Sequence, residues 1–200
     1  MRRLATALAA ALVLAGCPIP QPLPEYSAGT ITPPRIVMNE ATSQIATQGT
    51  VILVAPDTCT STATAPSYDL AATLVDQNTV EPVVARWFVN YDKYVPARYG
   101  PLPESGEIAA TSSTDTHRAV PPLTFHPWGG WGTVGGTGTL GGTVLASGRN
   151  EGAVQIVELV VSNGFDPAGA AAPLPYRSPA GAFEAQMFRW VFVTSAAACP

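Results

Sequence analysis

Residues 83–91 read VVARWFVNY, and this stretch decides the fold class of the chain. Along it, Trp87 and Val89 alternate with Arg86 and Phe88. A period of two places successive side chains on opposite faces of a β-strand. We therefore predict a strand over 83–91 with Trp87 on the face that enters the hydrophobic core.

Eight further stretches have the same character. They are short, rich in Val, Thr and aromatic residues, and separated by Pro, Gly, Asn and Asp. The chain contains 20 Pro in 200 residues, and a Pro inside a helix removes a backbone donor and clashes with the preceding turn. We therefore predict an all-β domain, an antiparallel β-sandwich, with residues 166–180 as a long loop and Trp190 in the core. The other predicted strands are 35–38, 50–54, 68–75, 107–112, 119–125, 138–145, 153–162 and 183–194.

Two of these strands resemble strands of bacterial immunoglobulin-like and PKD-like domains. Residues 86–92, RWFVNYD, resemble strand C with its core Trp, and residues 157–164, VELVVSNG, resemble strand F running into its turn. The resemblance implies an immunoglobulin-like arrangement of the sandwich. It does not imply any particular activity.

The N-terminus resembles the signal peptide of bacterial lipoproteins. Arg2 and Arg3 precede an apolar stretch over 4–15, and residues 14–17 read LAGC, like the lipobox of that family. The resemblance implies a signal peptide over 1–16 and a lipid on Cys17, which anchors the chain to a membrane. The residue after Cys17 is Pro rather than Asp, which by the same resemblance favours the outer membrane.

A proline-rich tether is predicted between the anchor and the folded domain. Pro alternates with other residues over 18–24, a pattern that favours extended polyproline II, and Pro33-Pro34 closes the segment. We therefore divide the chain into the signal peptide, the lipidated Cys with its tether over 17–34, and a β-sandwich domain over 35–200.

The two remaining cysteines predict a disulfide. With Cys17 lipidated, Cys59 and Cys199 are an even pair in an oxidising compartment. Cys59 precedes the stretch expected to be strand B, and Cys199 follows the last strand, expected to be strand G. In an immunoglobulin-like sandwich, the start of strand B and the end of strand G lie at the same pole, so this pairing is compatible with the expected fold.

Four exposed aromatic residues are the candidate ligand-binding side chains. Trp128 and Trp131 flank two glycines, and such a loop can present indole faces to a sugar or to a protein. Tyr94 and Tyr99, with Tyr91 before them and Lys93 and Arg98 between them, form a second candidate surface. The alternative is that these rings cover an end or edge of the sandwich.

Catalytic and cofactor chemistry have little support in the sequence. Residues 136–141 match G-x-G-x-x-G but no helix is expected after them, so a dinucleotide cofactor is not predicted. Asp115, His117 and His126 are expected to be solvated or capping residues rather than metal ligands. Glu104 and Glu107 form a carboxylate pair of a kind that is common in proteins without activity. We therefore expect no cofactor, no metal and no enzymatic role.

The charge excludes a nucleic-acid partner. The net charge is −4, and removal of residues 1–16 leaves eight basic and fourteen acidic residues, a net charge of −6. Three functions remain open: a lipid-anchored interaction or structural module of the cell envelope, a carbohydrate-binding module, and, with the least support, a secreted hydrolase. The expected partners are the membrane through Cys17 and an envelope protein or glycan.

Overall fold

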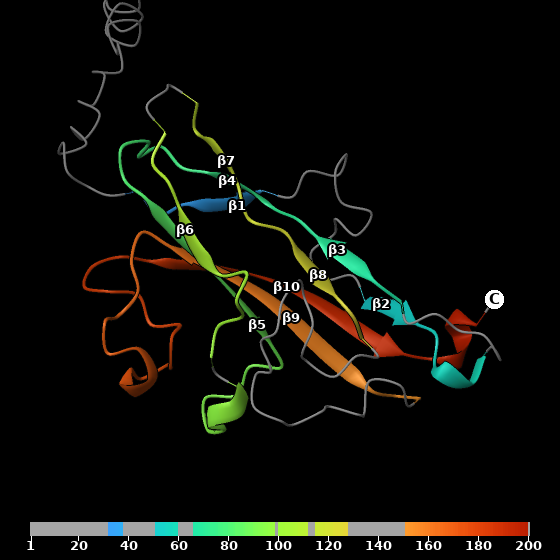
Figure 1. Cartoon of the computed structure of the whole chain (residues 1–200). Helices are drawn as coiled ribbons and strands as arrows, with labels where there is room; N and C mark the ends of the chain where they lie inside the picture. The colour runs from blue at the N-terminus through green and yellow to red at the C-terminus, as the bar shows by residue number, and fades with distance from the viewer. Residues whose placement is uncertain are drawn as a thin grey trace, which may run out of the picture. The chain divides into compact units, whose positions relative to one another are not determined.

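A five-stranded sheet with strand β9 at its centre and β5 beside it forms the larger part of the fold (Figure 1). Its strand order is β2-β10-β9-β5-β6, and all neighbours are antiparallel except β2, which runs parallel to β10. The computed structural model describes residues 32–37, 51–59, 66–98, 100–111, 115–127 and 151–199. These lie in the compact unit Ile31–Pro200. The five strands are β2 (Val51–Val54), β5 (Val83–Val89), β6 (Gly106–Ile108), β9 (Val154–Ser162) and β10 (Ala185–Thr194).

Two smaller antiparallel sheets make the second layer. One has the order β1-β4-β7 and the other pairs β3 with β8. Only two residues separate β3 from β4, and only three separate β7 from β8. The short strands are β1 (Arg35–Val37), β3 (Tyr68–Leu70), β4 (Thr73–Val75), β7 (His117–Ala119) and β8 (Leu123–Phe125).

The predicted strands over 68–75 and 119–125 are each divided in the structure, and the second begins two residues earlier than predicted. Pro121 and Pro122 lie in the gap between β7 and β8 and have no backbone N–H to donate to a neighbouring strand. The Val120 N–H donates to the Ala72 carbonyl at 3.0 Å, so the two gaps lie against each other. Most of the remaining predicted strands match within two residues, β6 ends four residues earlier than predicted, and 138–145 lies outside the described residues.

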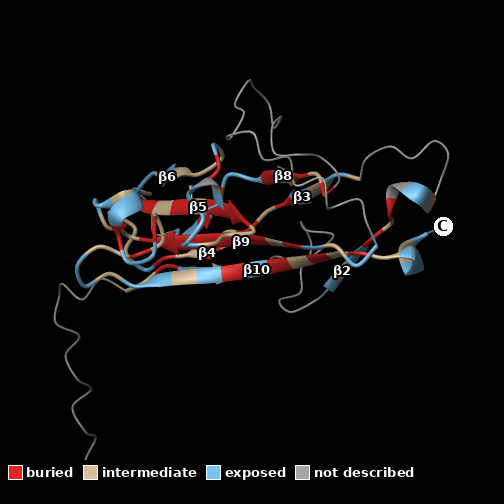
Figure 2. Ribbon diagram, turned by 90° about the horizontal axis from the view of Figure 1, so that it is seen from below, coloured by how far each residue is buried: buried red, intermediate tan, exposed pale blue. Residues whose placement is uncertain are grey.

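The core lies between the two layers. Trp87 of β5 and Trp190 of β10 are buried, as predicted, with ring centroids 5.4 Å apart. Their cluster includes Leu74 from the smaller sheets and Leu123 and Phe125 from β8. Buried residues run along β5, β9 and part of β10 (Figure 2). This packing makes the fold all-β and sandwich-like.

The long loop expected near 166–180 is an ordered segment that covers part of the outer face of the five-stranded sheet. Phe165 joins Phe88 of β5 and Val160 of β9 in a second cluster, against which Tyr176 packs. Gly169 has a φ of +55°, and a Cβ there would lie 3.2 Å from the Tyr176 ring. Glycine is therefore favoured at this turn by its backbone angle, and a larger residue would also have to displace the Tyr176 ring by a few tenths of an ångström.

Four short 3-10 helices complete the described structure. They are η1 (Asp57–Cys59), η2 (Pro96–Arg98), η4 (Gly169–Ala171) and η5 (Ala196–Ala198). Within the described ranges, no helix has the length and apolar character that a membrane span requires.

Candidate functional site

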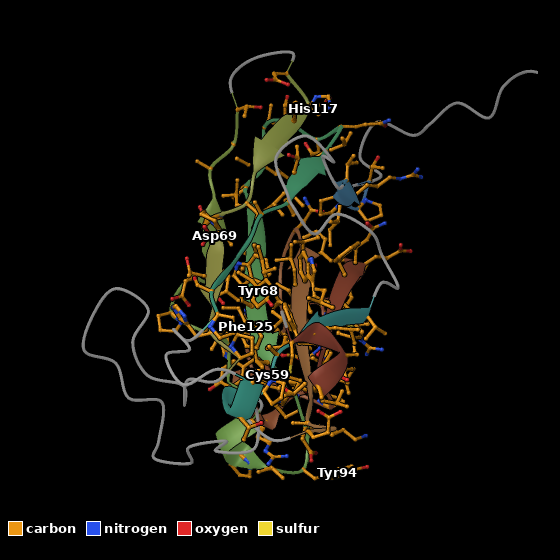
Figure 3. The ribbon with its side chains drawn as sticks, turned by 90° about the vertical axis from the view of Figure 1, so that its right-hand side faces the viewer. Cys59, Tyr68, Asp69, Tyr94, His117 and Phe125 are labelled. Atoms are coloured by element: carbon orange, nitrogen blue, oxygen red, sulfur yellow. A yellow bond between two sulfur atoms is a disulfide. The ribbon has the colours of Figure 1, made fainter. Side chains whose placement is uncertain are left out.

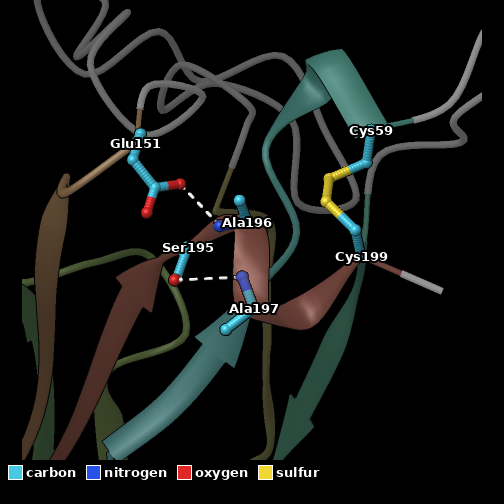
Figure 4. The surroundings of a disulfide bond; sticks show 6 residues. All are labelled: Cys59, Glu151, Ser195, Ala196, Ala197 and Cys199. Carbon is cyan, nitrogen blue, oxygen red and sulfur yellow. Dashed lines mark hydrogen bonds between the residues drawn. A yellow bond between two sulfur atoms is a disulfide. The ribbon is translucent and has the colours of Figure 1, made fainter.

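The predicted disulfide between Cys59 and Cys199 is present (Figure 4). It joins η1, which follows β2, to η5, which follows β10, and the two Cα atoms are 5.5 Å apart. Because β2 and β10 run parallel, they end at the same end of the sheet, which brings the two cysteines together. The Ser195 side chain accepts from the Ala197 N–H at 3.2 Å and so caps η5.

Tyr94 is the one candidate aromatic residue that the described part of the chain includes. Its side chain is 80% exposed, and the Lys93 Nζ lies 4.9 Å from the centre of its ring. Figure 3 shows Tyr94 at the opposite end of the molecule from His117. Trp128, Trp131 and Tyr99 lie outside the described residues, as does Cys17.

Tyr91 does not join Tyr94 on the surface. Its ring packs edge-on against Phe88 with centroids 5.3 Å apart, and the Arg177 guanidinium lies 4.2 Å above it. Its hydroxyl donates to the Pro175 carbonyl at 3.1 Å. Tyr91 therefore holds the segment after β9 onto the sheet and does not belong to the second candidate surface.

A group of arginines and one glutamate lies under and beside the same segment. Arg86 of β5 lies 4.1 Å above the Phe165 ring and donates to the Tyr176 carbonyl. Glu158 of β9 is almost fully buried and accepts from Arg177 at 3.0 Å and from Arg189 at 2.5 Å. No pattern in the sequence marks this group, because the pairing of β5 with β9 and the return of the later segment bring its members together. Its contacts are those of a structural network.

A second buried ion pair lies at the turn between β4 and β5. The Arg118 Nη2 is 3.1 Å from the Asp76 Oδ2, and both side chains have at most 1% of their surface exposed. Arg118 also donates to the carbonyls of Glu81 at 2.6 Å and Asn78 at 2.7 Å. Asp76 accepts from the Asn78 N–H at 2.9 Å. These groups fix the turn through the two Nη atoms of the guanidinium, while the buried Arg118 Nε has no hydrogen-bond partner among the described residues.

The three residues weighed as metal ligands do not form a set. The Asp115 Oδ1 lies 3.4 Å from the His117 Nδ1, and both side chains are 64% exposed. Among the residues that the structure describes, no group of three His, Cys, Asp or Glu side chains could hold a metal ion. The G-x-G-x-x-G match at 136–141 lies outside those residues.

An aliphatic surface lies on the outer face of the five-stranded sheet, and we call it the aliphatic face. The register aligns two rows of three branched side chains across β2, β10 and β9. Three of the six are 48–55% exposed, and the other three are partly buried. The rows are Val51, Val191 and Ile156, and Leu53, Val193 and Val154. Periodicity alone could not reveal this face, because β2 is next to β10 only in the folded sheet.

Alkaline pH is expected to destabilise the fold through Tyr91. Burial raises the pKa of its phenol above the ordinary 10.0, the Glu158 and Asp92 carboxylates add to this rise, and Arg177 opposes it. The unfolded chain therefore loses this proton at a lower pH than the folded chain. Stability is unaffected below the unfolded pKa and falls as the pH rises from there through the higher folded value.

Urea unfolding on both sides of pH 10, with phenolate absorbance of the native protein, measures this effect. Tyr91→Phe is expected to lose less stability than the wild type over the same pH interval. Equal losses in the two proteins would contradict the assignment to Tyr91.

Comparison with known proteins does not place the chain in a family. It matches no protein-family model, no curated protein and no solved structure. Its function is therefore argued from features of this structure: the aliphatic face, the exposed Tyr94 and the disulfide.

Proposed function

We propose that this chain is a lipid-anchored lipoprotein of the cell envelope, in the outer membrane, whose immunoglobulin-like sandwich is a non-catalytic protein-binding module. The observation that carries the proposal is the aliphatic face. Contiguous exposed apolar surface on a soluble fold marks interaction sites, whereas isolated exposed apolar side chains do not.

The strand order supports the immunoglobulin-like part of the proposal. Lettered in chain order, β1, β3 with β4, and β7 with β8 correspond to strands A, B and E of one sheet. Strands β10, β9 and β5 correspond to G, F and C of the other. This division resembles the one between the two sheets of an immunoglobulin domain, with β2 added beside strand G and β6 beside strand C, and it supports the proposal.

The aliphatic face suits a protein partner. Val51, Leu53 and Val154 each expose about half of their surface, while the partly buried side chains between them make the surface continuous. The neighbouring row of the sheet carries Arg189, which pairs with Glu158, and Glu158 also pairs with Arg177. An uncharged centre beside a polar margin is the usual composition of a protein interface.

Two features support an envelope location. The lipobox-like residues at 14–17 carry the anchor proposal, and the Cys59–Cys199 disulfide is of the kind that persists outside the reducing cytoplasm. Lipid chains on Cys17 would hold the domain at the membrane, with the proline-rich segment as its spacer.

Photocrosslinking in intact cells tests the protein-binding role. A photoreactive amino acid at Val51 is expected to give a discrete crosslinked protein adduct, and Val154→Lys in the same chain is expected to reduce it at least fivefold. A lysine in the aliphatic face must be desolvated on binding, which costs free energy. Val80→Lys is the matched control, because Val80 is 77% exposed but lies off this face.

The anchor is tested in the same cells. Cys17→Ser is expected to move the protein from the membrane fraction to the soluble fraction and to abolish labelling by a clickable fatty acid. Membrane retention of Cys17→Ser would refute the anchor. An adduct of equal yield in Val154→Lys and Val80→Lys would refute the aliphatic face as the binding surface.

A further inference from the structure

The loop that connects β5 to β6 begins with a short closed turn at Asp92–Arg98. The Asp92 N–H donates to the Arg98 carbonyl at 3.2 Å, and the Arg98 N–H donates to the Val95 carbonyl at 2.7 Å. The Asp92 Oδ1 accepts from the Tyr94 N–H at 2.9 Å. These bonds fix the backbone on which Tyr94 stands, so little conformational entropy remains to be lost there when a ligand binds.

The Tyr94 side chain is highly exposed to solvent although its backbone lies in this hydrogen-bonded turn. With 80% of its surface exposed, it is the most exposed large hydrophobic residue described. Lys93 lies over its ring, and the other described aromatic rings are at least partly buried by their neighbours. A tyrosine ring held outward by a rigid turn is a ready stacking platform.

The turn is also basic in an acidic protein. It carries Lys93, the one lysine of the sequence, together with Arg98 and Asp92, while the chain as a whole has a net charge of −4. Neither Lys93 nor Arg98 forms an ion pair with any residue that the structure describes. The hydrogen bond between the Asp92 N–H and the Arg98 carbonyl closes the turn. Arg98 therefore lies next to Asp92 in space, on the same turn as Lys93 and Tyr94.

We propose that this turn binds an acidic sugar, with Tyr94 stacking on the pyranose ring and Lys93 and Arg98 pairing with its carboxylate. A planar aromatic ring matches the C–H face of a sugar, and the two cations match an anionic substituent at the ring edge. Inorganic phosphate would use the cations alone. A neutral sugar would use only Tyr94. The site does not depend on the aliphatic face or on the protein partner proposed above.

Calorimetric titration of the full chain with trigalacturonate tests the proposal. We expect saturable binding that weakens with added salt, because ionic strength screens the exposed cations. Tyr94→Ala is expected to weaken binding at least tenfold, Tyr94→Phe less than threefold, and Lys93→Gln or Arg98→Gln about fivefold each. Arg35→Gln is the matched control for an exposed arginine elsewhere and is expected to bind as the wild type does.

The ligands that complete the experiment are maltotriose and inorganic phosphate. Maltotriose, which has no carboxylate, is expected to bind at least tenfold more weakly than trigalacturonate, and phosphate is expected not to displace trigalacturonate at equal concentration. The proposal fails if the folded protein does not bind trigalacturonate or if Tyr94→Ala binds it normally. Equal binding of maltotriose would remove the acidic-sugar assignment, and displacement by phosphate would reduce the site to an anion site.

Discussion

Replacing Cys59 and Cys199 together by serine is expected to lower the free energy of unfolding by up to about 5 kcal/mol. The disulfide closes a loop whose ends are 140 residues apart, and in the chain-entropy model a loop of that length restricts the unfolded state by about this amount. Urea unfolding of the oxidised protein and of the double variant gives the difference.

The reduced wild type is the control for this experiment, because it removes the covalent bond while it keeps the cysteine side chains. We expect it to unfold at the same urea concentration as the double variant. Native-state hydrogen exchange should show the greatest loss of protection in β2 and η5, which the bond joins at the end of the sheet. Unchanged stability in both proteins would mean that other contacts restrict the chain equally well.

Replacing Arg118 by methionine is expected to destabilise the fold by about 3–5 kcal/mol, the range for breaking a buried ion pair by removal of one partner. Methionine keeps most of the apolar stem but leaves the Asp76 carboxylate buried without its cation. It also removes the donors to the Asn78 and Glu81 carbonyls, which hold the turn between β4 and β5.

Two variants make this prediction specific. Arg35→Met removes an exposed arginine and is expected to change the free energy of unfolding by less than about 0.5 kcal/mol. Asp76→Asn combined with Arg118→Met should recover part of the lost stability, because it removes the unpaired charge and keeps an acceptor for the Asn78 N–H. If Arg118→Met and Arg35→Met had equal effects, the buried pair would not be a major source of stability.

Strand positions and the core tryptophans followed from alternation along the chain. In 83–91 the alternating pattern correctly placed Trp87 on the core face of β5, and the cysteine count correctly paired Cys59 with Cys199. Both inferences depend on local periodicity or on composition. The division of the strand near Pro121 was missed, although proline itself marks the position at which the ladder stops.

The candidate sites were less predictable. Tyr91 and Tyr94 are three residues apart and were weighed together as one candidate surface, but Tyr91 packs under Arg177 and Tyr94 is exposed. Nothing near Tyr91 in the sequence shows that a segment more than 80 residues later returns to cover it. Arg118 reads as one polar residue in a short strand, and its burial depends on Asp76, which comes from a different part of the chain.

By itself the sequence determined the all-β class, the approximate strands, the tryptophan core and the disulfide pair, because these depend on neighbours in the chain and on residue counts. Only the tertiary structure decided which strands pair, that β2 lies parallel to β10, and that the segment after β9 packs on the outer sheet face. It also decided the composition of the aliphatic face. These features arise from contacts between residues far apart in sequence. Many arrangements of the strands share the same local pattern, and burial of apolar area together with pairing of charges selects one of them.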